Sequence, residues 1–268
     1  MMLLIKKMNF GKRFKYPLVY SDYEYRLAKE CIIPELKQLG IDISEKKLLD
    51  AGCGFGGCSV AFAEEKAKCS AFDSSTHQIY IARKFARQRK VKVKFFIDDI
   101  CNLREKGKFD IIVFREVIEY VRSPYRALFF LNRALKPNGF LYITFQPWYG
   151  PYGGHQHHPD SITRFIPFFH LLPKFIVFNA LKNKRGLMKK GSSYVDEIKH
   201  IIKNKISIAK FDNLVRISGL RIHKKNIYLL RPAFKIRYGL PIIRSDIVPH
   251  IPIINEFITS GAEYILRK

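Results

Sequence analysis

The chain has 268 residues, 47% of them hydrophobic, which is enough for one large α/β domain with an elaboration and excludes a disordered protein. A formal net charge of +25 fits nucleic acid or an anionic membrane surface as a partner, and it equally fits a lysine-rich surface without such a partner. The five cysteines form no C-x-x-C pair, so neither a disulfide framework nor a zinc knuckle is indicated.

The N-terminal part of the chain is expected to be helical. Residues 1–7 contain only five apolar residues before lysine intervenes, too few for a signal peptide or a membrane span, and we expect a cytoplasmic protein. Apolar residues at helical spacing over 22–38, with acids early and a lysine late, predict a helix that leads into the first strand.

Strands and helices are expected to alternate after this helix. The apolar patterns predict strands at 47–51, 68–72, 92–97, 109–114 and 139–145, and helices at 57–66, 75–89 and 123–135. Repeated β-α-β units predict a mostly parallel sheet with helices on both faces. Such sheets bind ligands beyond the carboxyl ends of their strands.

A glycine-rich loop follows the first predicted strand, in the run Asp50-Ala-Gly52-Cys-Gly54-Phe-Gly56-Gly57. The glycines fit both the G-x-G-x-x-G dinucleotide fingerprint and an alternating G-x-G-x-G, and Asp73 lies where either site would have its ribose-binding acid. Asp50 separates the two, because a carboxylate before the first glycine suits a positively charged cofactor such as S-adenosylmethionine.

The next strands also end in polar residues. Asp98 and Asp99 follow the third strand, and Arg115 and Glu116 follow the fourth. A single acid at a strand end is commonly a cap or a turn residue. A glycine loop with acids at the next three strand ends indicates one ligand site at this edge of the sheet.

Residues 45–146 resemble a class I S-adenosylmethionine-dependent methyltransferase of the Rossmann-like kind. The glycine loop resembles the first motif of that family, residues 115–120 its E-V-L-E-H stretch with Tyr120 in place of His, and residues 135–141 its L-K-P-G-G-x-L turn. The resemblance implies a three-layer α/β fold with a mostly parallel seven-stranded sheet, an antiparallel last strand and an inserted lid after strand five. It also implies S-adenosyl-L-methionine as the cofactor.

Roles for individual residues follow from this resemblance. Asp73 is expected to bind both ribose hydroxyls, Asp99 the adenine amino group, and Asp50 to order the loop and face the positive end of the cofactor. A phenol is no base near neutral pH unless its pKa is lowered, so the role of Tyr120 stays open. The implied cofactor site comprises Asp50, Gly52, Cys53, Gly54, Gly56, Asp73, Ser74, Asp98, Asp99, Ile100, Arg115 and Glu116.

The loop after the fifth predicted strand is expected to face the acceptor, because it leaves the sheet at the same edge. It contains the only tryptophan and three of the eight histidines. His155 is the expected general base for a hydroxyl acceptor, since a neutral imidazole is suited to that role at cytoplasmic pH. A metal site is not expected, because Asp160 alone accompanies the histidines. The expected acceptor-binding residues are Tyr149, Tyr152, His155, His157 and His158.

Residues 162–181 are unusually apolar but are interrupted by Pro167 and Pro173, which excludes a membrane span. Followed by lysines and arginines, the segment is expected either to pack over the cleft or to lie on an anionic membrane at the inner face. We expect an N-terminal helical cap (1–44), a cofactor-binding core (45–146), an acceptor-facing insertion or lid (147–206) and a C-terminal completion of the sheet (207–268).

Three functions are compatible with these patterns. The preferred one is methyl transfer by in-line displacement to a small-molecule, sugar or lipid-linked acceptor, at a hydroxyl. The sugar follows from a weaker resemblance of the Gly153-Gly154-His155 loop and residues 256–264 to methyltransferases associated with cell-surface glycan synthesis. The basic charge keeps RNA methylation, and hence a nucleic-acid partner, as an alternative. A third interpretation is a cofactor-binding protein without turnover.

Overall fold

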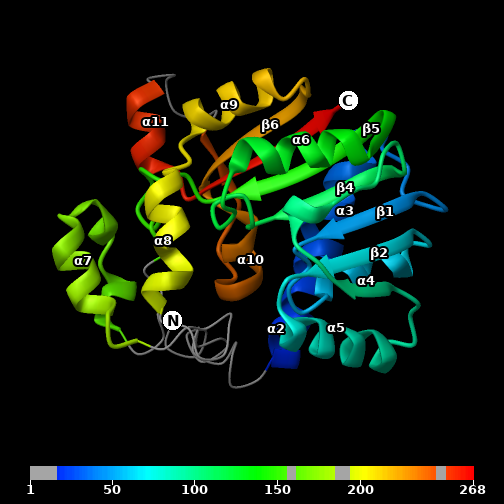
Figure 1. The fold of residues 1–268 in the computed structure, drawn as a ribbon, viewed down its shortest axis with the longest axis horizontal. Helices are drawn as coiled ribbons and strands as arrows, with labels where there is room; N and C mark the ends of the chain where they lie inside the picture. Colours follow the sequence, from blue (N-terminus) through cyan, green and yellow to red (C-terminus); the bar gives the residue numbers. More distant parts are fainter. Residues whose placement is uncertain (1–16, 156–160, 185–193, 246–251) are drawn as a thin grey trace.

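A computed structural model describes residues 17–155, 161–184, 194–245 and 252–268. Its centre is an eight-stranded sheet in the order β3-β2-β1-β4-β5-β8-β6-β7 (Figure 1). Strands β3 to β5 run parallel, and the pairs β5·β8, β8·β6 and β6·β7 are antiparallel. The bounds are β1 Lys47–Ala51, β2 Lys68–Asp73, β3 Lys94–Ile97, β4 Phe109–Arg115, β5 Leu135–Phe145, β6 Arg221–Leu230, β7 Ile243–Arg244 and β8 Gly261–Arg267.

The sheet confirms the predicted α/β class and the antiparallel last strand. It has one strand more than the seven expected, because the two-residue β7 pairs with the outer edge of β6. The fifth strand begins at Leu135 rather than at 139, since Leu135 already pairs with Phe109 before a register shift.

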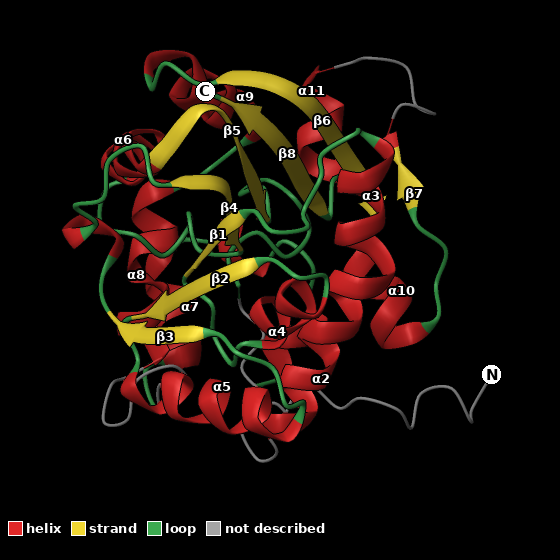
Figure 2. Ribbon diagram, turned by 90° about the vertical axis from the view of Figure 1, so that its right-hand side faces the viewer, coloured by secondary structure: helices red, strands yellow, loops and turns green. Residues whose placement is uncertain are grey.

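Helices cover both faces of the sheet (Figure 2). Alternate residues of β1 point to opposite sides: Leu48 packs in one apolar cluster and Leu49 in the other. The Leu48 side is covered by α2 Pro17–Leu27, α3 Ile33–Gln38, α4 Gly57–Glu64, α5 Thr76–Gln88 and α10 Pro232–Tyr238. The Leu49 side is covered by α6 Pro124–Ala134 and α9 Ile208–Ile217.

The N-terminal helix is longer than predicted and is not uniform. It begins at Pro17 and passes through a π-helical turn, Ala28–Ile32, before it continues as α3. Pro34 is the second residue of α3. Because proline has no N–H and its ring clashes with the carbonyl four residues earlier, which lies within the turn, it accounts for the wider turn.

A layer beyond the carboxyl ends of the strands contains the inserted segment. It holds two 3₁₀ turns, Ile162–Phe165 and Phe169–Leu171, the helices α7 Lys174–Leu181 and α8 Tyr194–Asn204, and, from the C-terminal part, α11 Pro252–Ile258 (Figure 1). Trp148, in the loop after β5, packs with residues of α7 and α8 in a separate apolar cluster. No helix in the described part of the chain is long and apolar enough to cross a membrane.

Candidate active site

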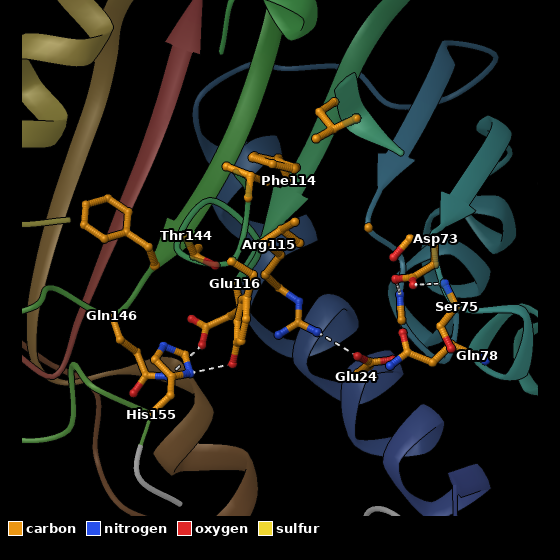
Figure 3. A pocket seen from close by; sticks show the side chains of 18 of the residues that line it. Glu24, Asp73, Ser75, Gln78, Phe114, Arg115, Glu116, Thr144, Gln146 and His155 are labelled. Atoms are coloured by element: carbon orange, nitrogen blue, oxygen red, sulfur yellow. Dashed lines mark hydrogen bonds and ion pairs between the residues drawn. The ribbon is translucent and has the colours of Figure 1, made fainter. Parts of the chain in front are cut away.

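The carboxyl ends of β1, β2, β4 and β5 open on a cavity of about 1570 Å³. Figure 3 shows Asp73 and Ser75 on one side of it and Glu116 and His155 on the other. Ligand pockets for one drug-sized molecule have volumes of roughly 300–1,000 Å³. The cavity therefore has room for a cofactor and an acceptor together.

The glycine loop forms one wall of the cavity, and its conformation requires glycine. Gly52 has φ +72°, and a Cβ there would lie 2.6 Å from Cγ2 of Val117. Gly56 has φ +79°, and a Cβ there would lie 2.6 Å from Cβ of Ala82 on α5. Both positions combine a left-handed backbone with a close neighbour, so any side chain would displace the loop.

Asp73 ends β2 beside this loop and lines the cavity. Its carboxylate accepts the backbone N–H of Gly54 at 3.0 Å and that of Ser75 at 2.9 Å. These two bonds fix the side chain between the glycine loop and the start of α5. On the same wall, Asp99 begins the 3₁₀ turn Ile100–Asn102 and accepts the N–H of Cys101 at 2.7 Å.

Asp50 lies beneath the loop, and it is not part of the cavity wall. It accepts the hydroxyl of Ser59 on α4 at 2.5 Å, which links β1 to the helix that follows the loop. Burial raises the pKa of Asp50 to about 6, against the opposing effect of the Ser59 hydrogen bond. The hydrogen bond to α4 agrees with the expectation that Asp50 orders the loop, and its position relative to the positive end of the cofactor stays a prediction.

The other predicted cofactor residues either line the cavity or do not. Cys53 and Gly56 do not line it, and neither does Asp50. The cavity wall itself contains Gly52, Gly54, Asp73, Ser74, Asp98, Asp99, Ile100, Arg115 and Glu116.

Glu24 of α2 is a site residue that sequence reasoning missed. It forms a buried ion pair with Arg115 at 3.0 Å (Figure 3). It also accepts the N–H of Gly57 at 3.4 Å. The N-terminal helix thus holds the glycine loop and the end of β4 together. The sequence spacing could have indicated its burial, because Glu24 lies on the same helix face as Tyr20 and Leu27, which are both buried.

Glu116 follows β4 with φ +56°, a conformation uncommon for a side-chain-bearing residue. Both of its carboxylate oxygens lie 2.9 Å from Nη1 of Arg231, and Gln146 donates to one of them at 3.0 Å. Burial alone would raise the pKa of Glu116, but Arg231, His155 and Arg115 outweigh it and lower the pKa to about 2. Glu116 is therefore an ionised anchor for Arg231, a residue that sequence reasoning did not assign.

His155 lines the opposite wall together with Tyr120. The Tyr120 hydroxyl lies 2.8 Å from Nδ1 of His155, and Nε2 lies 3.4 Å from Oε1 of the buried Glu119. Tyr194 of α8 donates its hydroxyl to the backbone carbonyl of His155. The residue left open by the sequence and the predicted base are thus in contact with each other.

Two of the remaining expected acceptor residues, Tyr149 and Tyr152, do not form this wall. Tyr149 is exposed and packs against Phe257, with ring centroids 5.6 Å apart, and Tyr152 is also absent from the wall. His157 and His158 lie outside the described residues.

The far end of the cavity has a polar floor on the sheet. Glu263 of β8 accepts the hydroxyls of Tyr142 and Tyr228, at 2.5 Å and 2.9 Å, and the amide of Asn226 at 2.7 Å. Burial raises the pKa of Glu263. The floor thus presents phenol rings from β5 and β6 whose hydroxyls are held by one buried acid.

Comparisons with known proteins agree with this architecture. A family model described as a methyltransferase domain matches residues 23–172, more than half of the chain. Two relatives are named ubiquinone biosynthesis O-methyltransferase. The one from Rickettsia conorii is 29% identical over 130 residues, 48% of this chain and 45% of the relative. The one from Pelagibacter ubique is 30% identical over 134 residues, which are 49% of this chain and 56% of the relative. The chain thus matches about half the length of these relatives.

Solved structures share the fold over most of the chain. An S-adenosylmethionine-dependent methyltransferase from Mesorhizobium loti has a TM-score of 0.55 at 17% identity, covering 88% of this chain and 96% of that one. Magnesium protoporphyrin IX methyltransferase from Synechocystis PCC 6803, solved with bound SAH, has a TM-score of 0.54 at 14% identity, covering 91% and 83%. The chain therefore belongs to the methyltransferase-domain family.

Proposed function

We propose that this protein transfers the methyl group of S-adenosylmethionine to a hydroxyl of a small molecule. The observation that carries the proposal is the contact of Tyr120 with His155 on the cavity wall, which offers a route for the hydroxyl proton. Relatives named as O-methyltransferases support oxygen as the acceptor atom.

The wall around the glycine loop fits the cofactor in its donor chemistry. The backbone of Gly52 and Gly54 would pack against its methionine and ribose parts, and Asp73 would accept the ribose hydroxyls. Asp99 would accept the adenine amino group, with the amide of Ile100 beside it. When bound, the cofactor would supply a methyl group that is activated for transfer by its bond to a positively charged sulfur.

Removal of the acceptor hydroxyl proton is assigned to Tyr120 and His155 acting together. Glu119 lies on the Nε2 side of the imidazole, which favours a proton on Nε2 and leaves Nδ1 to accept from the Tyr120 hydroxyl. Tyr120 takes the acceptor proton as it passes its own to Nδ1. The imidazolium that results lies beside Glu119 and the ionised Glu116, which stabilise its charge.

Polar side chains also line the acceptor end of the cavity, among them Thr144, Gln146 and Arg231. Such a lining supports a hydroxylated or oxygen-rich acceptor over a plain hydrocarbon.

Methyl transfer from labelled cofactor into fractionated extract of the source cell tests this function. We expect label in a hydroxylated small molecule, and none with the Asp73→Asn variant. Label in lipid or polysaccharide would instead support a lipid-linked or sugar acceptor. Label confined to RNA would refute the proposal, and cofactor binding without label in any fraction would indicate a protein without turnover.

A further inference from the structure

The outer face of the inserted segment exposes a run of large apolar side chains. The most exposed are Ile162 at 75%, Phe175 at 67% and Phe165 at 63%. Soluble monomers rarely expose contiguous apolar patches of this kind without an interaction that uses them. The outer lid face, as we define it, comprises Ile162, Phe165, Ile166, Phe168, Leu171, Leu172, Phe175 and Ile176.

The exposed residues are additional to those that hold the segment in place. Phe169, Val177 and Leu181 come from the same stretch, and they are buried in one cluster with Trp148 and with Ile198 of α8. His170 contacts the carbonyl of Trp148 at 2.6 Å. The segment therefore has a buried apolar cluster of its own, and the residues of the outer lid face are not members of it.

The segment that carries the outer lid face has side-chain charges of one sign. Within its described part, residues 161–184, the sequence contains no Asp or Glu and has Lys or Arg at positions 164, 174, 182 and 184. Aromatic and aliphatic side chains beside a basic stretch are typical of segments that lie in the interface of an anionic bilayer. A second copy of this chain is disfavoured as the partner, because each copy carries a net charge of +25.

We propose that the outer lid face docks on an anionic membrane, with its apolar side chains in the headgroup region and the neighbouring lysines on the lipid phosphates. The inner side of the same layer contributes Tyr194 and Ile198 to the cavity wall. Docking therefore brings one wall of the acceptor cavity to the membrane surface, where amphipathic small molecules concentrate. The docking itself does not depend on which acceptor is methylated.

Cosedimentation of the full chain with vesicles tests this proposal. We expect binding to vesicles that contain phosphatidylglycerol, weakening with salt, and little binding to pure phosphatidylcholine. The double variant Phe165→Asp with Phe175→Asp should lower the partition coefficient about tenfold or more, because it removes the two most exposed rings. The control Phe129→Asp changes an aromatic residue of α6 that is 48% exposed, and it should bind as the wild type does.

Affinity for S-adenosylmethionine serves as the folding check and should stay within about twofold of wild type in both variants. If the Phe165→Asp, Phe175→Asp variant loses this affinity, the variant Lys174→Glu with Lys182→Glu is used in its place, since both lysines are exposed. This second variant should also lose binding to anionic vesicles. Absence of binding at low salt would refute the proposal. Self-association in light scattering that disappears in the double variant would also refute it, and would identify a second copy as the partner.

Discussion

Tyr120 and His155 come from different parts of the chain, 35 positions apart, and their contact changes the assignment of each. His155 alone was the expected base, but its Nε2 is buried next to Glu119 and its Nδ1 meets the Tyr120 hydroxyl. The motif that Tyr120 belongs to usually has histidine at this position, and here a histidine from the loop after β5 contacts the tyrosine that replaces it.

The contact predicts that either residue limits the chemical step. Tyr120→Phe and His155→Gln should each lower kcat by about 10²–10⁴-fold, since general-base catalysis contributes about that much. The double variant should be little worse than either single one, because the two act as a unit. The exposed Tyr149→Phe serves as control. A Tyr120→Phe enzyme with kcat within about threefold of wild type would contradict the relay.

Asp50 predicts a pH dependence of stability. Its pKa is raised to about 6 by burial, so the folded protein binds this proton more tightly than the unfolded chain. The contribution of this proton to the free energy of unfolding is complete below about pH 4 and is lost as the pH rises through 6. Two pKa units correspond to roughly 3 kcal/mol.

The Asp50→Asn variant isolates this effect, because an amide oxygen can still accept the Ser59 hydroxyl and does not titrate. Between about pH 4 and pH 7, the free energy of unfolding of the wild type should fall by roughly 3 kcal/mol relative to the variant. Urea unfolding at several pH values measures this. A difference that does not change with pH would show that Asp50 does not titrate in this range.

At the scale of elements, the tie between α2 and the glycine loop is the feature with the largest expected effect. Glu24→Gln leaves the buried Arg115 without its ionised partner, so it should lower the free energy of unfolding by about 3–5 kcal/mol and weaken cofactor binding. Asp22→Asn breaks an exposed ion pair of the same helix, with Arg89, and should cost less than about 1 kcal/mol. Equal losses in urea unfolding would contradict this ranking.

The strands predicted between 47 and 145, and the helices between them, lie within two residues of the observed bounds, except at the start of β5. β1 has the bounds that its apolar run predicts, because a strand buried on both faces is marked by its own residues. The π turn before α3 and the early start of β5 were missed, since the first follows from a proline clash within the helix and the second from pairing with a distant strand.

At the scale of the whole molecule, the cofactor should stabilise the fold through the loop that it contacts. At a concentration of 100 times its Kd, S-adenosylmethionine should raise the free energy of unfolding by about 2.7 kcal/mol. In a chain of this size each kcal/mol raises the Tm by about 2–4 °C, so the Tm should rise measurably when the cofactor is added. The Asp73→Asn variant should show a smaller rise at the same concentration. An identical rise would argue against Asp73 as a cofactor ligand.

The sequence by itself determined the fold class and the family, and it predicted that the glycine loop and the strand-end acids Asp73 and Asp99 line one site, because glycines, strand-end acids and their spacing are local in the chain. Tertiary structure decided that Asp50 supports the loop from behind, and that Arg231 is held by Glu116. It also decided which apolar residues of the inserted segment are buried and which form the outer lid face. These depend on contacts between residues far apart in the chain, and no local pattern records which side chains will meet.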